Sequence, residues 1–272
     1  MTNKTILKWA GSKVRIMEQL RPHLPKTKRL VEPFAGSCAV MMNTDYEQYL
    51  IADVNFDLIN LYRHILDNPN DFIKYLYNLF IDANRENIFL KRKKDFNFKV
   101  SSSHPLFNLV NYYHAGLFLY LNQHSHKNSF NYSSKGEILS IFEKHRKPYF
   151  PEKEILNFIR KAGKANIVCI EWQDTLTLVD FNDGIYCDPP YMGKEFNQYY
   201  TTNFNNADHE ALAITLKYIN EQQGNPVTVS NSYAAKALYA DLGFTIHEID
   251  APYFNPINKN RKKASEIIAV LK

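Results

Sequence analysis

Cysteine is scarce in this sequence of 272 residues, and its distribution argues against a zinc-binding protein and against a disulfide-stabilised one. The three cysteines, Cys38, Cys169 and Cys187, lie far apart, without the paired spacing of a zinc site or of a disulfide framework. His124 and His126 form a His-x-His pair, but no further ligands accompany them in the sequence. We therefore expect no bound metal and a reducing, cytoplasmic environment.

Long apolar runs are also missing. No apolar segment near the N-terminus is typical of a secretion signal, and the longest candidate for a span, residues 109–121, is interrupted by Asn111 and His114. Residues 11–13 lack the first glycine and the residue order of a phosphate-binding loop. The sequence therefore predicts a globular protein that does not associate with membranes.

Positive charge is concentrated in the middle of the chain. The formal net charge is +5, yet the segment from Arg85 to Lys161 has fourteen Lys or Arg and six Asp or Glu, which leaves −3 for the rest. A basic segment of this kind favours a polyanionic partner such as a nucleic acid. The alternative is a solvated surface, and residues 91–94, Lys-Arg-Lys-Lys, are expected to be an exposed basic helix face.

Residues 184–191, Gly-Ile-Tyr-Cys-Asp-Pro-Pro-Tyr, have the pattern of a buried strand that ends in a stiff turn. In open α/β sheets such turns border the ligand. Asp188 and the Pro189 carbonyl are suited to accept the two hydrogens of an exocyclic amine, while the exposed ring of Tyr191 stacks on a flat base. The alternative is an ordinary Asp-Pro turn followed by a surface tyrosine.

Two earlier strands carry a second group of candidate residues. Residues 30–34 are predicted to be the first strand, and the turn of residues 35–37 contains Gly36, which permits close approach of a nucleoside. Residues 49–52 are predicted to be the second strand, which ends at Asp53, a position from which a carboxylate reaches ribose hydroxyls. Alternatively, Asp53 caps the following helix.

The remaining pattern predicts an α/β fold with an insertion. Residues 58–163 repeat apolar side chains at helical spacing, which indicates a mostly helical insertion in a domain formed by residues 1–57 and 164–272. Five further strands are predicted at residues 166–170, 184–188, 226–230, 244–249 and 267–271. Because helices separate most of the strands, the sheet should be mainly parallel, with the last two strands antiparallel.

These features together resemble a Rossmann-like S-adenosylmethionine-dependent methyltransferase, and more narrowly the Dam family of DNA adenine-N6 methyltransferases. The resemblance covers residues 7–13, 31–37, 51–59, 118–122, 147–151, 185–191 and 262–270. It implies a bacterial or phage-encoded enzyme, monomeric when free, that transfers methyl from S-adenosylmethionine to N6 of a flipped adenine in double-stranded DNA. It also implies that the helical insertion recognises the target.

The resemblance assigns roles residue by residue. It implies a cofactor site formed by Trp9, Lys13, Glu32, Phe34, Gly36, Asp53 and Asp188. It also implies that Asp188, Pro189 and Tyr191 hold the flipped adenine, and that Lys8 reaches a base of the target.

The chain departs from the family pattern in two places. The family often has a second glycine where this chain has Cys38, which we expect to adopt a helical conformation that preserves the cofactor pocket. The family's guanine-reading arginine is replaced by Asn131, whose amide matches an adenine edge. Its neighbours Lys127, Asn128 and Lys135 complete the expected DNA-binding set, with a target that departs from GATC or is looser. The alternatives are a non-catalytic DNA-binding protein on the same scaffold and an RNA adenine methyltransferase.

Overall fold

Seven strands form one sheet in a computed structural model of the chain, which describes residues 2–81, 84–98, 103–126, 131–145, 147–193, 204–254 and 261–272. The side chains of residues 251–254 and 261–265 are not part of this description. The strands are β1 (Arg29–Glu32), β2 (Gln48–Ala52), β3 (Ala165–Val168), β4 (Gly184–Cys187), β5 (Val227–Ser232), β6 (Thr245–Phe254) and β7 (Arg261–Leu271).

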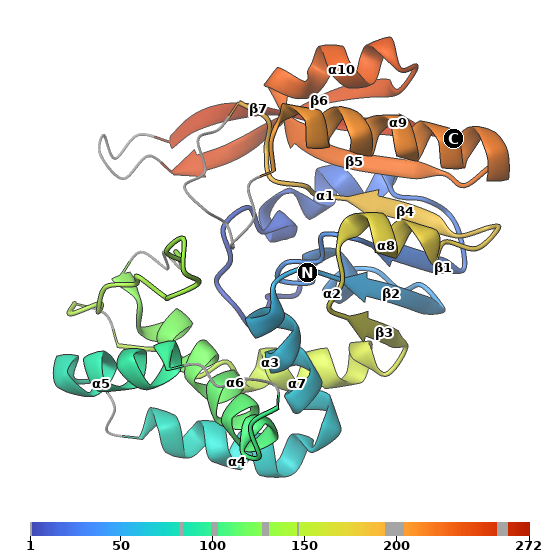
Figure 1. The fold of residues 1–272 in the computed structure, drawn as a ribbon. Helices are drawn as coiled ribbons and strands as arrows, with labels where there is room; N and C mark the ends of the chain where they lie inside the picture. The colour runs from blue at the N-terminus through green and yellow to red at the C-terminus, as the bar shows by residue number, and fades with distance from the viewer. Residues whose placement is uncertain are drawn as a thin grey trace.

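The strand order is β3-β2-β1-β4-β5-β7-β6 (Figure 1). The first five strands of this order pair in parallel, and β7 pairs antiparallel with both β5 and β6. The predicted mainly parallel sheet with an antiparallel final pair is therefore confirmed. The chain moves outward from β1 to β3 and then returns to β4 on the other side of β1. This reversal places a ligand-binding position at the carboxyl ends of β1 and β4.

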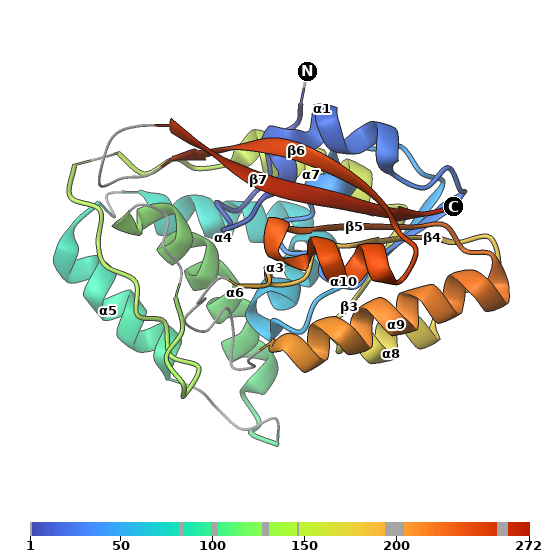
Figure 2. The same cartoon turned by 90° about the horizontal axis from the view of Figure 1, so that it is seen from above.

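Apolar side chains of the strands alternate between the two faces of the sheet, and each face has its own helices. Val31 and Ile185 pack toward α8 (Trp172–Thr177), α9 (Asn206–Gln223) and α10 (Lys236–Asp241). Leu30 and Tyr186 pack toward the other face, with α1 (Met17–Leu20), α2 (Ala39–Met42) and the helices that follow β2. Figure 2 shows α8, α9 and α10 on one side of the sheet and α1 on the other. Short 3-10 helices η1 (Lys13–Ile16), η2 (Arg21–His23) and η4 (Tyr233–Ala235) flank α1 and α10.

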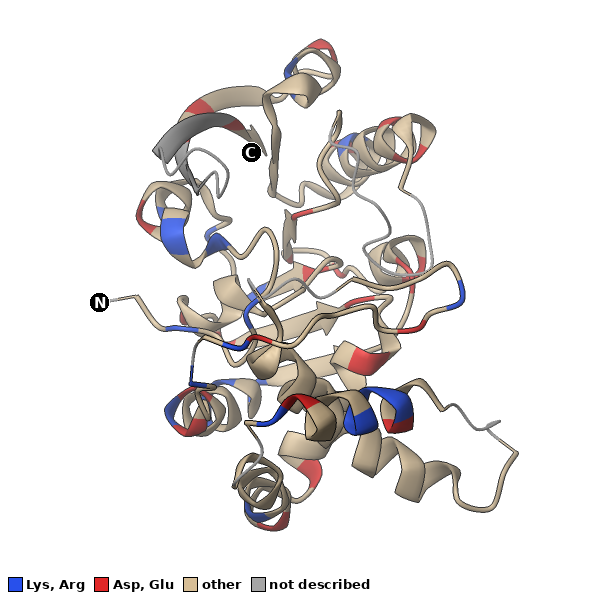
Figure 3. Ribbon diagram, turned by 90° about the vertical axis from the view of Figure 1, so that its left-hand side faces the viewer, with Lys and Arg blue, Asp and Glu red and all other residues tan. Residues whose placement is uncertain are grey.

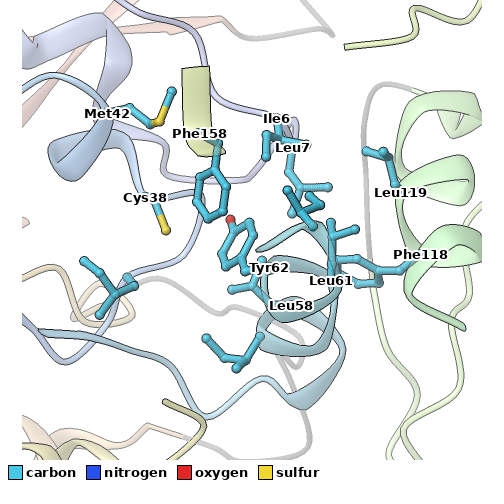
Figure 4. Packing of buried hydrophobic residues seen from close by; sticks show 14 of the residues in the cluster. Ile6, Leu7, Cys38, Met42, Leu58, Leu61, Tyr62, Phe118, Leu119 and Phe158 are labelled. Atoms are coloured by element: carbon cyan, nitrogen blue, oxygen red, sulfur yellow. The ribbon is translucent and has the colours of Figure 1, made fainter. Parts of the chain in front are cut away.

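Five helices lie between β2 and β3 in the described part of the chain. They are α3 (Phe56–Asp67), α4 (Pro69–Phe80), α5 (Glu86–Asn97), α6 (Phe107–His124) and α7 (Glu152–Ala162). The second half of α6 is buried, while Leu109 in its first half is exposed. Tyr62 of α3 packs on Phe158 of α7, with ring centroids 4.8 Å apart, close to Cys38 (Figure 4). These contacts fix the helices against the side of the sheet that bears β1 and β2.

The predicted solvated basic face of residues 91–94 is wrong for two of its four residues. Arg92 lies over the ring of Tyr120, at 4.3 Å from its centroid, and donates a hydrogen bond to the Leu79 carbonyl. Lys93 donates to the Ser140 carbonyl at 3.1 Å. A helical pattern does not distinguish a solvated cation from one that stacks on an aromatic ring or binds a backbone carbonyl.

Candidate active site

The turn after β4 brings three predicted residues into contact. The ammonium of Lys13 lies 2.7 Å from a carboxylate oxygen of Asp188 and 4.8 Å from the centroid of the Tyr191 ring. The Lys13 side chain is 5% exposed and also donates to the Gly11 carbonyl at 2.7 Å. The site therefore holds a cation between a carboxylate and an aromatic face.

Tyr191 is buried, with 9% of its surface exposed, so the predicted exposed ring is wrong. Its hydroxyl donates a 2.7 Å hydrogen bond to Glu266 on β7, while the Lys13 ammonium lies over its face. Burial, with the nearby Asp188 carboxylate, raises the pKa of Tyr191 well above its ordinary value, so the hydroxyl stays protonated. Pro189 is also buried. The turn is thus fixed from the side of β7 as well as by its prolines.

Glu32, the last residue of β1, lies buried beside this turn, with 2% of its surface exposed. Burial, together with the Asp188 carboxylate, raises the pKa of Glu32 from 4.5 to about 8. Among the residues that the structure describes, one of its carboxyl oxygens has no hydrogen-bond partner. A buried carboxyl with this pKa is largely protonated at neutral pH and keeps a polar atom available for a ligand.

Asp53 follows β2 and holds the glycine turn that follows β1. It accepts a 2.9 Å hydrogen bond from the Gly36 amide through one oxygen and another from the Asn55 amide through the other. The helix α3 is capped instead by Asn55, which accepts from the Leu58 amide at 3.1 Å. Burial raises the pKa of Asp53 to about 6. Asp53 is therefore not the cap of α3, and each oxygen retains a lone pair for a hydroxyl donor.

Gly36 approaches the indole of Trp9 closely. A Cβ atom at Gly36 would lie 3.2 Å from the indole, and the residue has φ +46°, which favours glycine. The hydroxyl of Tyr62 donates to the Gly36 carbonyl at 2.8 Å. Phe34 packs edge-to-face on Phe204, with ring centroids 5.7 Å apart. Trp9, Phe34 and Gly36 thus add aromatic and backbone surface near the ends of β1 and β2.

Cys38 has φ 57° and ψ 35°, a left-handed conformation that costs a residue with a side chain. The helical conformation expected for this residue is therefore wrong: Cys38 is left-handed, at the position where the family often has its second glycine. Its side chain is fully buried against the core. The backbone of the turn thus keeps the geometry that glycine adopts freely.

The predicted DNA-binding residues lie on the insertion and the N-terminal segment. Asn131 and Lys135 are exposed, whereas Lys127 and Asn128 lie outside the described residues. The backbone carbonyl of Asn131 accepts a hydrogen bond from the Leu139 amide, which pairs two segments of an irregular hairpin. Leu139 and Ile141 expose apolar side chains there.

Lys8 is held by a residue that the sequence did not single out. Asn122 of α6 accepts from the Lys8 amide at 3.0 Å and donates to the Lys8 carbonyl at 2.9 Å. Glu266, the partner of Tyr191, was missed in the same way. The available signals were a polar residue that ends an apolar helix and an acidic residue that begins the apolar end of a strand. Neither signal indicates which distant residue is the partner.

Other parts of the described chain do not compete with this site. A cavity of about 800 Å³ lies at the opposite edge of the sheet, lined by the loops before β1 and β2, and it contains none of the predicted site residues. No cluster of three or more metal-ligating side chains occurs among the residues that the structure describes. Within the same residues, no helix is both long and apolar enough to cross a membrane.

Comparison with known proteins supplies independent information. A statistical model of the family described as D12 class N6 adenine-specific DNA methyltransferase matches residues 9–254. The retron Ec67 DNA adenine methylase of Escherichia coli is 43% identical, over 98% of this chain and 90% of that protein. DNA adenine methylases of Serratia marcescens and Vibrio cholerae are 37% and 32% identical, over 84% and 98% of this chain and 83% and 95% of those proteins.

Proposed function

Because the chain belongs to the D12 class of N6 adenine-specific DNA methyltransferases, we propose that it takes its methyl group from S-adenosylmethionine and transfers it to an adenine flipped out of the duplex. Adenine methylation in DNA is the activity of the family. The methyl donor, the flipped base and the roles of individual residues are the steps that we add.

The residues at the ends of β1 and β2 fit S-adenosylmethionine, which supplies a methyl group on a positively charged sulfur. Asp53 has lone pairs for ribose hydroxyls, because each of its oxygens accepts from a single backbone amide in the part of the chain that the structure describes. Gly36 is half-buried and its backbone lies close to the indole of Trp9, so a ligand at this turn would meet backbone atoms beside an aromatic surface. Glu32 has a buried oxygen that finds no partner within the described ranges, and this oxygen suits an ammonium or hydroxyl donor. We assign Lys13 to the carboxylate of the methionine part and Phe34 to the apolar wall.

The observation that supports adenine binding most is the position of the Lys13 ammonium. This N–H donor lies against the carboxylate of Asp188 and over the ring of Tyr191. An adenine stacked on Tyr191 would direct its N6 amine to the same carboxylate. We infer that Lys13 leaves Asp188 when the base binds, and that Asp188 and the Pro189 carbonyl then accept the two amine hydrogens.

This arrangement provides positioning and electrostatic stabilisation for methyl transfer. Two acceptors on the amine hydrogens orient the nitrogen lone pair toward the methyl carbon. As the N–C bond forms, positive charge develops on the nitrogen and is stabilised by the Asp188 carboxylate. The sulfur would keep the electron pair of the broken S–C bond, and the methylated amine would then give one proton to water. The base must leave the stack because its amine is otherwise paired.

We further propose that residues 58–163 recognise the target while residues 1–57 and 164–272 carry the chemistry. Asn131 and Lys135 are exposed in this insertion, and the Asn122 hydrogen bonds tie Lys8 to α6. Asparagine pairs bidentately with adenine and does not offer the fork that arginine offers to guanine. The target is therefore expected to depart from GATC or to be looser.

The decisive experiment measures the transfer of labelled methyl from S-adenosylmethionine to duplex DNA by the purified full chain. We expect label on adenine N6 in duplex DNA and little on structured RNA of matched length. Absence of label in DNA would refute the function. Preferential labelling of RNA would favour the RNA methyltransferase, and failure to bind S-adenosylmethionine in calorimetry would favour the non-catalytic DNA-binding protein.

A further inference from the structure

Positive and negative residues are separated from each other along the last two strands of the chain and the segment that joins them. Residues 251–265 contain four cations, Lys259 and three consecutive residues from Arg261 to Lys263, and no acidic residue. Acidic residues, Asp250 and Glu266, stand immediately before and after this segment. Glu266 holds Tyr191 of the base-binding turn, whereas none of the four cations belongs to the cofactor site or to that turn as described above.

The same segment extends beyond the body of the sheet. β7 pairs with β5 only from Leu271 to Glu266, where β5 ends at Ser232. Pairing of β6 with β7 continues further, to Phe254 opposite Arg261. The outer five residues of β7 thus form a two-stranded ribbon, which at the rise of an extended strand reaches about 16 Å past the end of β5.

The ribbon extends from the edge of the sheet that carries the active site. β5 runs parallel to β4, and β7 runs opposite to both, so the start of β7 lies past the carboxyl ends of β4 and β5. Glu266, at the base of the ribbon, accepts the hydrogen bond of Tyr191. Figure 1 shows the outer ends of β6 and β7 on the same side of the molecule as α5.

We propose that this ribbon, with Arg261, Lys262 and Lys263 near its outer end, is a second DNA-binding arm that contacts phosphates of the duplex beside the active site. The proposal rests on the function given above, since the partner is the DNA that is methylated. Lysine and arginine neutralise phosphates without reading sequence. The ribbon therefore contributes affinity and orientation, while the helical insertion contributes sequence preference.

Two cations of the insertion are directed toward its interior, so they are less available for contact with phosphates than the composition indicates. Arg92 and Lys93 of α5 are used by Tyr120, Leu79 and Ser140 inside the insertion. Figure 3 looks onto the carboxyl edge and shows Lys and Arg positions interspersed with Asp and Glu on the helices, rather than gathered on one helix. The outer part of the ribbon differs from these helices, because its positive residues are not accompanied by acidic ones.

The test compares the salt dependence of duplex binding between the full chain and the double variant Lys262→Ala/Lys263→Ala. Binding is measured by fluorescence anisotropy without methyl donor, between low and physiological salt. We expect weaker binding to all sequences and a salt slope reduced by about two counterions, because each lost phosphate contact removes about 0.9 from the slope. The turnover number at saturating DNA and the mapped target sequence should not change.

Two controls make the result specific. Lys262→Arg/Lys263→Arg keeps both charges and should retain the slope of the wild type. Lys26→Ala/Lys28→Ala removes two exposed lysines before β1, at the opposite edge of the sheet, and should change the slope little. This pair matches the double variant in net charge.

An unchanged salt slope in Lys262→Ala/Lys263→Ala would overturn the proposal. Cations on a free strand edge also prevent strand-to-strand association. If that is their only role, the variant self-associates while its DNA binding keeps the original slope, and the proposal is again overturned. Because binding is measured without methyl donor, a chain that binds DNA but transfers no methyl would refute the proposed function and leave the arm tested independently.

Discussion

Lys13 and Asp188 form an ion pair with 2.7 Å between ammonium and carboxylate, although 175 residues separate them in the sequence. The lysine side chain is 5% exposed and the aspartate side chain 19%. Asp188 therefore has two tasks in the free protein. It is the proposed acceptor for the adenine amine, and it neutralises a buried ammonium.

Replacement of Asp188 should affect activity and stability separately. Asp188→Asn keeps the shape of the side chain and removes its charge, so methyl transfer should fall by on the order of a hundredfold or more. From the sequence, Asp188→Ala is expected to leave the fold intact because the residue lies in a turn. The ion pair changes this expectation: the unpaired Lys13 ammonium should lower the free energy of unfolding by about 1–3 kcal/mol.

A double-mutant cycle separates the two effects. Lys13→Met should restore much of the stability of the Asp188→Ala protein, because the unpaired buried ammonium is removed. Methyl transfer by the double variant should stay as low as that of the Asp188→Ala protein, which lacks the acceptor for the adenine amine. Urea unfolding and single-turnover methyl transfer give the two quantities. Near-normal turnover in Asp188→Asn would remove this residue from the mechanism.

The left-handed conformation of Cys38 leads to a prediction about stability. Cys38→Gly and Cys38→Ala both remove the buried thiol, but only glycine relieves the strain at φ 57°. We expect the glycine variant to be more stable than the alanine variant by about 1 kcal/mol in chemical denaturation. Equal stability, or greater stability of the alanine variant, would show that the turn relaxes when the thiol is removed.

The buried carboxyl of Glu32 predicts a loss of stability at alkaline pH. Its pKa is about 8 in the folded protein and 4.5 ordinarily, so the folded state binds the proton more tightly. The corresponding stability is complete below pH 4.5 and is lost as the pH rises to 8. Glu32→Gln stays neutral, so its free energy of unfolding should rise relative to the wild type by about 2–3 kcal/mol between pH 6 and pH 8.

The exposed Glu47 provides the control for Glu32. Glu47→Gln should follow the pH dependence of the wild type over the same range, because the side chain at this position is in contact with water and is not part of the buried site. A Glu32→Gln protein whose stability runs parallel to that of the wild type from pH 6 to pH 8 would mean that Glu32 is ionised in the fold.

Local patterns predicted the strands and the turns of the site, because a buried strand, a glycine turn and an Asp-Pro-Pro turn each depend on neighbouring residues. The sheet and the positions of Glu32, Asp53 and Asp188 at its carboxyl edge follow from these patterns. The burial of Tyr191 did not follow, because it depends on Glu266, 75 residues later. The anchoring of Lys8 depends in the same way on Asn122, 114 residues away.

The extent of β6 and β7 was also underestimated from the sequence. The predicted strands covered residues 244–249 and 267–271, whereas pairing continues to Phe254 and Arg261. Proline at position 252 and the three cations reduce the strand pattern of this segment. Pairing between two strands that protrude from the sheet does not need an apolar face, so hydrophobic alternation does not reveal it.

Sequence preference should depend on Asn131 and general affinity on Lys135, because an amide reads a base edge and an ammonium binds a phosphate. Both side chains are exposed on the insertion, on either side of the buried Tyr132, whose hydroxyl donates to Asp57. Asn131→Ala should relax the target by about 1–3 kcal/mol of discrimination at one base pair. Lys135→Ala should weaken all duplexes similarly and lower the salt slope by about one counterion. Mapping of methylated adenines after expression of each variant distinguishes the two effects. Strict GATC methylation that persists unchanged in Asn131→Ala would mean that another residue reads the target, because an alanine at this position has no hydrogen bond to offer to a base.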